Sequence, residues 1–374
     1  MGFLGIKNKG RRKLIFNIGS SEINGALVFF RYGFKPDIER RFKSENIILP
    51  EVDLRRLWRR IEGPIDKIMR SYKEITRKAD EALVVFSSPW YYSEIYPRLD
   101  KFDSPRKITG NYAQKIIDMA EDDFKKQARA EFGLLKDDLA FTRSQITGAK
   151  INGYSLKQPG QNISGKFAKE IFLSVYTSAF FSKAAIFLKN AFLERGIKTL
   201  EFQSSPWIFF EVLSKDGQRD VSVVEIGGEI TDIIMIKEGE MRKIASFGRG
   251  YNYIVRRLAS VLRLGLDEAA STLSAYEENK LDRELKESVN RSLEESIKEW
   301  AGLFKETVEK QMLPDLMPEK IILTGGAEIS EFSNTLNSSS LNIYTSHGRS
   351  FLRPEKTFDL MEFCIKYAQY AANQ

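Results

Sequence analysis

The sequence predicts a two-lobed α/β fold that carries a small inserted α+β domain. The first observation is a pattern of strand, glycine turn and strand that occurs at Phe16-Asn17-Ile18-Gly19-Ser20 and again at Val224-Glu225-Ile226-Gly227-Gly228. The copies lie more than half the chain apart, which indicates a duplicated domain, since solenoid repeats have periods of about 20 to 50 residues. The second observation is a segment of different composition between the copies, Ser104–Ile151, which contains a charged stretch expected to be helical.

Each copy of the pattern is expected to open a meander of three strands. The expected strands are Leu14–Ile18, Ile23–Phe30 and a run ending at Phe42 in the first meander, and Val223–Ile226, Thr231–Ile236 and Met241–Ser246 in the second. Apolar residues recur with a helical period over Asp53–Lys78, although Gly63-Pro64 should break or kink this helix. The other expected strands are Ala82–Phe86, Leu139–Gln145, Lys198–Phe202 and Lys320–Leu323. The other expected helices are Tyr112–Glu131, Ser174–Glu194 and Thr357–Gln374, and several helices are expected within Asn252–Met312.

Length and composition indicate a folded protein with more than one domain. The chain has 374 residues, of which 42% are hydrophobic and 29% charged, values typical of soluble globular proteins. Its single cysteine, Cys364, and single histidine, His347, exclude disulfide frameworks, zinc clusters and histidine triads within one chain. Because no apolar run reaches the roughly 18 residues of a membrane-spanning helix, we expect a cytoplasmic protein, peripheral to the inner face of the cell membrane.

Basic residues exceed acidic ones by 58 to 51, but they concentrate only at the start of the chain. Residues 1–13 hold five basic side chains without an acid, together with four large apolar ones: Lys7, Lys9, Arg11, Arg12 and Lys13, and Met1, Phe3, Leu4 and Ile6. This basic leader is interpreted either as a contact for an anionic membrane surface or nucleic acid, or as a solvated end. Elsewhere basic and acidic residues alternate, so we expect no nucleic-acid partner.

Three glycine-containing turns follow predicted strands and suit the binding of a nucleotide. A glycine turn exposes backbone N–H groups, so two facing turns can hold a polyphosphate between them. Asn17 and Glu225 precede the two turns, where a carboxylate would hold magnesium through ordered waters. Thr324-Gly325-Gly326 can accommodate a purine and its ribose against backbone. Each turn taken alone is equally compatible with an ordinary hairpin or strand-to-helix connection.

These segments resemble the phosphate 1, phosphate 2 and adenosine motifs of the actin, Hsp70 and sugar-kinase superfamily, and in particular its bacterial branch that contains FtsA and PilM. The similarity is carried by residues 225–233 (EIGGEITDI), by Phe247-Gly248-Arg249-Gly250 before a helix, and by residues 322–327 (ILTGGA). It implies a two-lobed actin-like fold, which is a duplicated RNase H-like fold, with an inserted small α+β subdomain of the SHS2 type.

The resemblance also implies a site for ATP or ADP with Mg²⁺. The implied nucleotide contacts are Asn17, Gly19, Ser20, Ser21, Gly227, Gly228, Glu229, Thr231, Gly250, Thr324, Gly325, Gly326 and Ala327. The implied metal-binding residues are Asn17, Glu225 and Asp232, and the implied catalytic residues are Gln203 and Glu225.

The chain departs from the family pattern at positions that matter for hydrolysis. Asn17 replaces an acid, Glu225 replaces an aspartate, and Ala269-Ala270 stands where relatives have Ala-Glu. A weakened metal site slows phosphoryl transfer more than phosphate binding. We therefore expect a slow ATPase or none.

The resemblance divides the chain into a leader, two lobes and an insert. The expected ranges are 1–13 for the leader, 14–88 and 167–220 with the C-terminal helix 355–374 for lobe 1, 89–166 for the insert, and 221–354 for lobe 2. The favoured function is a PilM-like scaffold that docks the tail of a membrane protein in type IV pilus or secretion assembly.

Two other functions stay open from sequence alone. The first is an FtsA-like protein that self-associates into filaments or dimers at the membrane and tethers a division filament protein. The second is a superfamily kinase, for which no carboxylate base is evident. The chain reaches Gln374 directly after its closing helix, without the linker and membrane helix usual in FtsA, which favours the scaffold.

Overall fold

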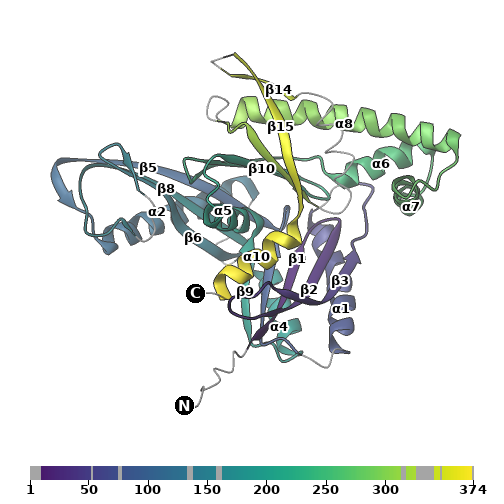
Figure 1. The fold of residues 1–374 in the computed structure, drawn as a ribbon, viewed down its shortest axis with the longest axis horizontal. Helices are drawn as coiled ribbons and strands as arrows, with labels where there is room; N and C mark the ends of the chain where they lie inside the picture. The colour runs from purple at the N-terminus through teal and green to yellow at the C-terminus, as the bar shows by residue number, and fades with distance from the viewer. Residues whose placement is uncertain are drawn as a thin grey trace, which may run out of the picture.

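The computed structural model describes residues 10–51, 54–74, 78–132, 138–156, 162–312, 317–325, 341–345 and 348–372. Figure 1 shows three parts: a body around the first sheet, a second sheet with long helices above it, and an arm. The expectations for residues 1–9 of the leader and for Gly326 and Ala327 fall outside the described residues.

The first sheet contains five strands in the order β3-β2-β1-β4-β9. These strands are β1 (Arg11–Ile18), β2 (Glu22–Phe30), β3 (Asp37–Glu45), β4 (Glu81–Phe86) and β9 (Thr199–Ser204). The first three form the expected antiparallel meander, and β4 and β9 extend it in parallel with β1. The side chains of β1 and β4 are almost all buried, as is usual for parallel strands covered on both faces.

The second sheet repeats this arrangement and adds one strand, in the order β12-β11-β10-β13-β15-β14. Its strands are β10 (Val221–Ile226), β11 (Thr231–Lys237), β12 (Glu240–Phe247), β13 (Lys320–Gly325), β14 (Leu341–Thr345) and β15 (Gly348–Asp359). Again an antiparallel meander leads into two strands parallel to its first member. The shared order confirms the predicted two-lobed, duplicated architecture.

A third sheet, β5-β8-β6-β7, forms the arm. Its elements are β5 (Tyr91–Lys107), α2 (Gly110–Phe132), β6 (Leu139–Ile151), β7 (Tyr154–Ser155) and β8 (Phe167–Phe181). One face of this sheet packs on α2 through a small core that includes Ile116, Ile171 and Leu173. The arm is the predicted inserted α+β domain.

Helices cover the outer face of each main sheet and also fill the space between the sheets. The helices are α1 (Leu54–Lys73) and α4 (Ser182–Leu193) on the first sheet, α6 (Tyr251–Leu262), α7 (Leu266–Glu277) and α8 (Arg283–Gln311) on the second, and α5 (Ser205–Lys215) and α10 (Leu360–Ala372) between them. One interlobe core joins both sheets, α5 and α10. No helix within the described residues is long and apolar enough to cross a membrane.

The helix expected at Ser174–Glu194 was wrong in its first half, because β8 continues to Phe181 and α4 begins only at Ser182. Residues Leu173–Phe180 are all buried, so they form a continuous run whose periodicity does not distinguish a strand from a buried helix. The β-branched and aromatic residues of this run favour a strand. Strand β8 pairs with β5 and β6 in the sheet of the arm.

Three other boundaries also differ from expectation. Helix α1 continues through Pro64, because Ile65, Ile68 and Met69 hold it against the core. The closing helix begins at Leu360, not at residue 355 or 357, since the preceding residues form β15 beside β13. Strand β1 starts at Arg11, so the expected leader overlaps the first sheet by three residues.

Candidate functional site

The two predicted glycine turns have the same local geometry. Gly19 N–H donates to the carbonyl of Glu22 at 3.0 Å, and Gly227 N–H donates to the carbonyl of Ile230 at 2.9 Å. Each turn follows the carboxyl end of a central strand, β1 or β10, and returns the chain into the next strand of its meander. The duplication therefore places two equivalent turns at the boundary between the lobes.

The two turns are in direct contact. Glu229 N–H in the second turn donates to Ser20 Oγ in the first turn at 2.9 Å, and Ser20 is 1% exposed. A methyl group added at Gly228 would lie 2.4 Å from the backbone nitrogen of Ser21. The structure brings Ser20, Ser21, Gly228 and Glu229 together. However, the donor that would meet a phosphate is used by a side chain of the opposite turn.

The start of α6 closes the second turn from the other side. Tyr251 N–H and Asn252 N–H donate to the carbonyls of Gly227 and Gly228 at 2.9 and 2.8 Å. A methyl group at Gly250 would lie 2.2 Å from the carbonyl oxygen of Gly227, so only glycine fits there. Gly250 therefore supports the turn by allowing this close approach of two backbone segments.

Asn17 and Glu225 each form a hydrogen bond with the hydroxyl of a different serine. Asn17 Nδ2 donates to Ser87 Oγ at 2.9 Å, and Ser205 Oγ donates to Glu225 Oε2 at 2.5 Å. No hydrogen bond of normal geometry reaches Glu225 Oε1 among the described residues.

Glu225 and Asp232 form a buried pair of carboxyl groups on neighbouring strands. They are directly opposite each other in the ladder between β10 and β11, and they are 2% and 1% exposed. Asp232 accepts from Tyr91 Oη at 2.9 Å and from Ser246 Oγ at 2.5 Å. Burial, followed by the charge of Asp232, raises the pKa of Glu225 to about 8, and burial also raises the pKa of Asp232.

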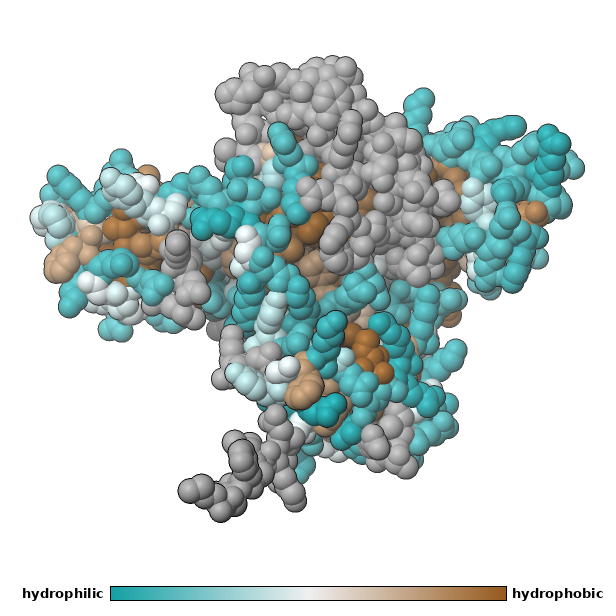
Figure 2. Space-filling model, viewed as in Figure 1, coloured by the Kyte–Doolittle hydropathy of each residue, from teal (hydrophilic) through white to brown (hydrophobic). Residues whose placement is uncertain are grey.

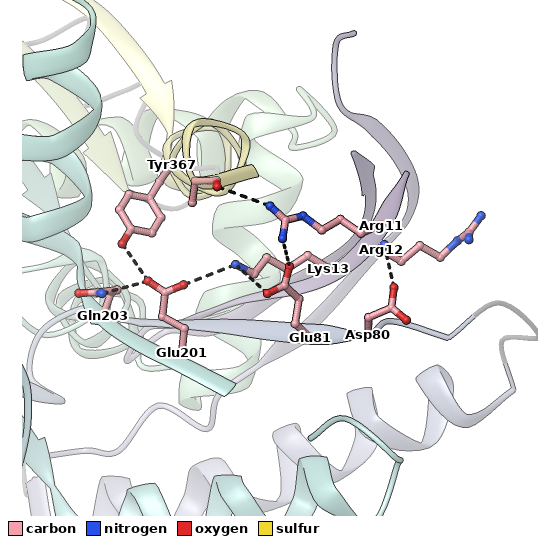
Figure 3. A network of polar contacts seen from close by, with 9 residues as sticks. Arg11, Arg12, Lys13, Asp80, Glu81, Glu201, Gln203 and Tyr367 are labelled. Carbon is pink, nitrogen blue, oxygen red and sulfur yellow. Dashed lines mark hydrogen bonds and ion pairs between the residues drawn. The ribbon is translucent and has the colours of Figure 1, made fainter. Parts of the chain in front are cut away.

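Gln203 lies on β9 and its amide is directed to a different polar network. Gln203 Nε2 donates to Glu201 Oε1 at 3.1 Å, and Tyr367 Oη of α10 donates to the same oxygen at 2.8 Å (Figure 3). Lys13 Nζ lies 3.4 Å from Glu201 Oε2 and 3.6 Å from Glu81. This network joins the start of the first sheet to α10, so the amide donor of Gln203 has a structural partner.

Glu229 and Thr231 have supporting roles that the sequence did not reveal. The Glu229 carboxylate forms a buried ion pair with Arg256 of α6 and accepts from Asn252 Nδ2 at 2.8 Å. Thr231 Oγ1 donates to the carbonyl of Arg249 at 2.6 Å and accepts from Trp300 Nε1 at 2.9 Å. Arg256 belongs to no sequence motif. Its position on α6 near the buried face was the one signal that could have indicated its ion pair with Glu229.

Thr324, in the predicted adenosine motif, is brought beside Glu225. The two residues are register partners in the parallel ladder between β10 and β13. Thr324 is fully buried, and its hydroxyl has no hydrogen-bond partner among the described residues. Gly325 ends the same strand.

The arrangement does not fit a magnesium-bound triphosphate between the turns. The Glu229 N–H already donates to Ser20 Oγ. Asn17 donates to Ser87, and Asp232 accepts from Tyr91 and Ser246. Within the described ranges there is no group of three or more histidine, cysteine, aspartate or glutamate residues able to hold a metal. Within the described part of the chain, Glu225 Oε1 is a buried carboxylate oxygen that accepts no hydrogen bond. A nucleotide would require the two turns to separate.

Comparison with known proteins identifies the fold but no close relative. No family model and no curated protein matches the sequence. A chain of a PilM–PilN type IV pilus biogenesis complex is 12% identical with a TM-score of 0.60, covering 94% of this chain and 89% of that one.

Two further solved structures resemble the chain more weakly. An actin-like ATPase fold protein from Bacteroides thetaiotaomicron is 9% identical, with a TM-score of 0.45, and covers 97% of this chain and 99% of that one. The ethanolamine utilization protein EutJ from Carboxydothermus hydrogenoformans is 14% identical, with a TM-score of 0.46, and covers 96% and 90%. The repeated sheet order described above and the similarity to the chain of the PilM–PilN complex bear out the two-lobed actin-like fold that the motifs predicted. Of these three structures, the chain of the PilM–PilN complex has a TM-score above one half.

Proposed function

We propose that this protein is a cytoplasmic actin-like scaffold that docks the tail of a membrane protein in a type IV pilus or secretion assembly, without turning over ATP. The observation that carries the proposal is the hydrogen bond from Glu229 N–H to Ser20 Oγ, which closes the two turns on each other. Catalysis of phosphoryl transfer depends on positioned donors and a metal ion. Here the Glu229 N–H donates to a side chain of the other turn, so it stabilises the fold.

The arm offers a surface for docking. At its root, Ile95 and Tyr176 are cross-strand partners on the sheet face that packs into the interlobe core. Farther along the same face, Leu99 and Phe172 are cross-strand partners, and Leu99 is 52% exposed while Phe172 is half-buried. Figure 2 shows hydrophobic surface on this arm. An apolar segment of a membrane protein's tail that packs on Leu99 and Phe172 would bury the exposed part of this sheet face.

The nucleotide part of the proposal is tested by titrating the purified protein with Mg-ATP and by following phosphate release in a single-turnover assay. We expect no binding heat and no release above the buffer rate, because the turns are closed by their own side chain. Ser20→Ala removes this closure and serves as the comparison. ATP hydrolysis by the unchanged protein would contradict the proposal.

The docking part is tested with peptides that correspond to cytoplasmic tails of single-span membrane proteins encoded next to this chain's gene. We expect one tail to bind the unchanged protein and to bind Leu99→Asp at least about tenfold more weakly, since a charge replaces buried apolar contact. Val261→Asp in α6 is the matched control, because Val261 is 53% exposed and lies on the other lobe. Equal binding by Leu99→Asp would exclude this face of the arm.

A further inference from the structure

The hairpin that joins β11 to β12 in the second sheet contacts the arm through an ion pair. Lys150 Nζ of β6 lies 3.2 Å from Glu238 Oε2 at the tip of the hairpin. Glu238 also pairs with Arg242 of β12 at 2.9 Å. Glu238 and Gly239 have φ values of +57° and +76°, the left-handed conformation of a two-residue hairpin turn. A tight turn therefore presents the Glu238 carboxylate to the arm.

A buried carboxylate lies beside this ion pair. Glu240, the first residue of β12, is 2% exposed, and its side chain packs against the backbone of Gly148 in β6. A methyl group added at Gly148 would lie 2.7 Å from Glu240 Oε2 and 3.0 Å from its Cγ. The register between β6 and β8 shifts next to Gly148. Any larger residue at position 148 would thus displace the Glu240 side chain.

The charge of Glu240 is incompletely compensated. Arg242 Nη2 lies 2.8 Å from Glu240 Oε2, but neither oxygen accepts a hydrogen bond of normal geometry from the described residues. Burial raises the pKa of Glu240, and the charge of Glu238 acts in the same direction, whereas Arg242, Lys150 and Arg219 oppose the rise. A buried carboxylate without full hydrogen bonding opposes the contact in which it is buried. The contact between the hairpin and the arm is therefore attractive at its edge and unfavourable at its centre.

We propose that the arm is held at its angle by a clasp that can open while both parts stay folded. The clasp consists of Gly148 and Lys150 of the arm and Glu238 and Glu240 of the second sheet. The arm has its own small core against α2, so it does not depend on the clasp to fold. At the root of the arm, Ile95 belongs to the interlobe core and would remain in place as the arm turns. Because partly exposed ion pairs contribute little to stability, opening the clasp costs little.

The test is the distance between two spin labels on the full chain, measured by pulsed electron paramagnetic resonance. One label is attached at Tyr154→Cys in the arm and the other at Val261→Cys in α6. These two side chains are 79% and 53% exposed, whereas the natural Cys364 is buried and does not compete for the label. With the clasp intact, we expect one narrow distribution of distances.

Two substitutions break the clasp in different ways. Gly148→Val inserts a side chain where the Glu240 carboxylate lies, and Lys150→Met removes the ion pair but keeps most of the length of the side chain. Each should add a second population at longer distance. Lys101→Met is the matched control, because Lys101 pairs at 3.1 Å with Glu170 inside the arm.

A second population in both clasp variants, with Lys101→Met unchanged, supports the proposal. The same narrow distribution in Lys150→Met as in the protein with labels alone overturns it, since the arm would then be held by its root. An equal second population in Lys101→Met also overturns it. If circular dichroism shows that Gly148→Val does not fold, Lys150→Met decides by itself. The measurement uses no partner, so its outcome does not depend on the docking of a tail.

Discussion

At the scale of single residues, the closure of the two turns depends on glycines that leave no room for a side chain. Replacing Gly228 with alanine would place its methyl group 2.4 Å from Ser21 N and 2.8 Å from Ser20 Oγ. Overpacking of a tight contact typically costs about 1–3 kcal/mol. The neighbouring Gly248 has nothing within 4 Å of the corresponding position.

We therefore expect Gly228→Ala to lower the free energy of unfolding by about 1–3 kcal/mol, and Gly248→Ala to change it by less than about 0.5 kcal/mol. Urea denaturation followed by circular dichroism measures both values. If the two substitutions cost the same, the turns do not touch in solution.

The sequence indicated the positions of the two glycine turns, but it did not indicate which residues hydrogen-bond between them. The glycine turns at Gly19 and Gly227 follow from local pattern, because a strand that ends in such a turn has few alternatives. The bond between Ser20 and Glu229 joins residues from the two copies of the duplicated domain. No local pattern carries that information, since it depends on how closely the lobes approach.

At the scale of elements, helix α1 contains two residues that disfavour helices and yet remains continuous. Gly63 is exposed, and a methyl group there would meet nothing within 4 Å. Glycine inside a helix costs roughly 0.5–1 kcal/mol relative to alanine, because it loses more backbone freedom on folding. Gly302 in α8 has the same open surroundings.

We expect Gly63→Ala and Gly302→Ala each to raise the free energy of unfolding by about 0.5–1 kcal/mol, and the double variant to show the sum, because the helices lie on different sheets. Chemical denaturation gives the three values. A destabilising effect of Gly63→Ala alone would show that α1 is bent or broken at Gly63-Pro64 in solution, as the sequence suggested.

Elements were predicted well where periodicity was unambiguous and poorly where residues are buried on all sides. Strands β1, β2, β10 and β11 were anticipated within a few residues, since glycine turns bound them. The end of β8 was missed because its pairing with β5 and β6 overrides local preference. The start of α10 was missed because the residues before it pair with β13 as strand β15. These pairings join residues distant in sequence.

At the scale of the whole molecule, the carboxyl pair Glu225 and Asp232 links all three parts. Ser205 of α5 contacts Glu225, and Tyr91 of the arm contacts Asp232. The folded pKa of Glu225, about 8, exceeds its ordinary value of 4.5. The folded state therefore retains a proton that the unfolded chain releases, and its stability is greatest below about pH 4.5 with respect to this group.

We expect this contribution to be lost as the pH rises from about 4.5 to about 8, with a slope of at most about 1.4 kcal/mol per pH unit. Glu225→Gln keeps the size of the side chain without its charge and should reduce the slope by the part that Glu225 contributes, leaving the part due to Asp232, whose pKa is also raised. Thermal melts of both proteins across this range provide the comparison. Parallel profiles would show that Glu225 titrates normally in the fold.

The interlobe core makes the two halves of the chain depend on each other. Val85 of the first sheet and Val223 of the second belong to the same buried cluster, together with Trp207 of α5 and Phe363 of α10. Each half has a buried core of its own, but this additional core is shared between the halves. A chain cut between residues 220 and 221 would give two fragments with complementary apolar surfaces, each dependent on the other to stay in solution. We therefore expect the two halves to fold as one unit.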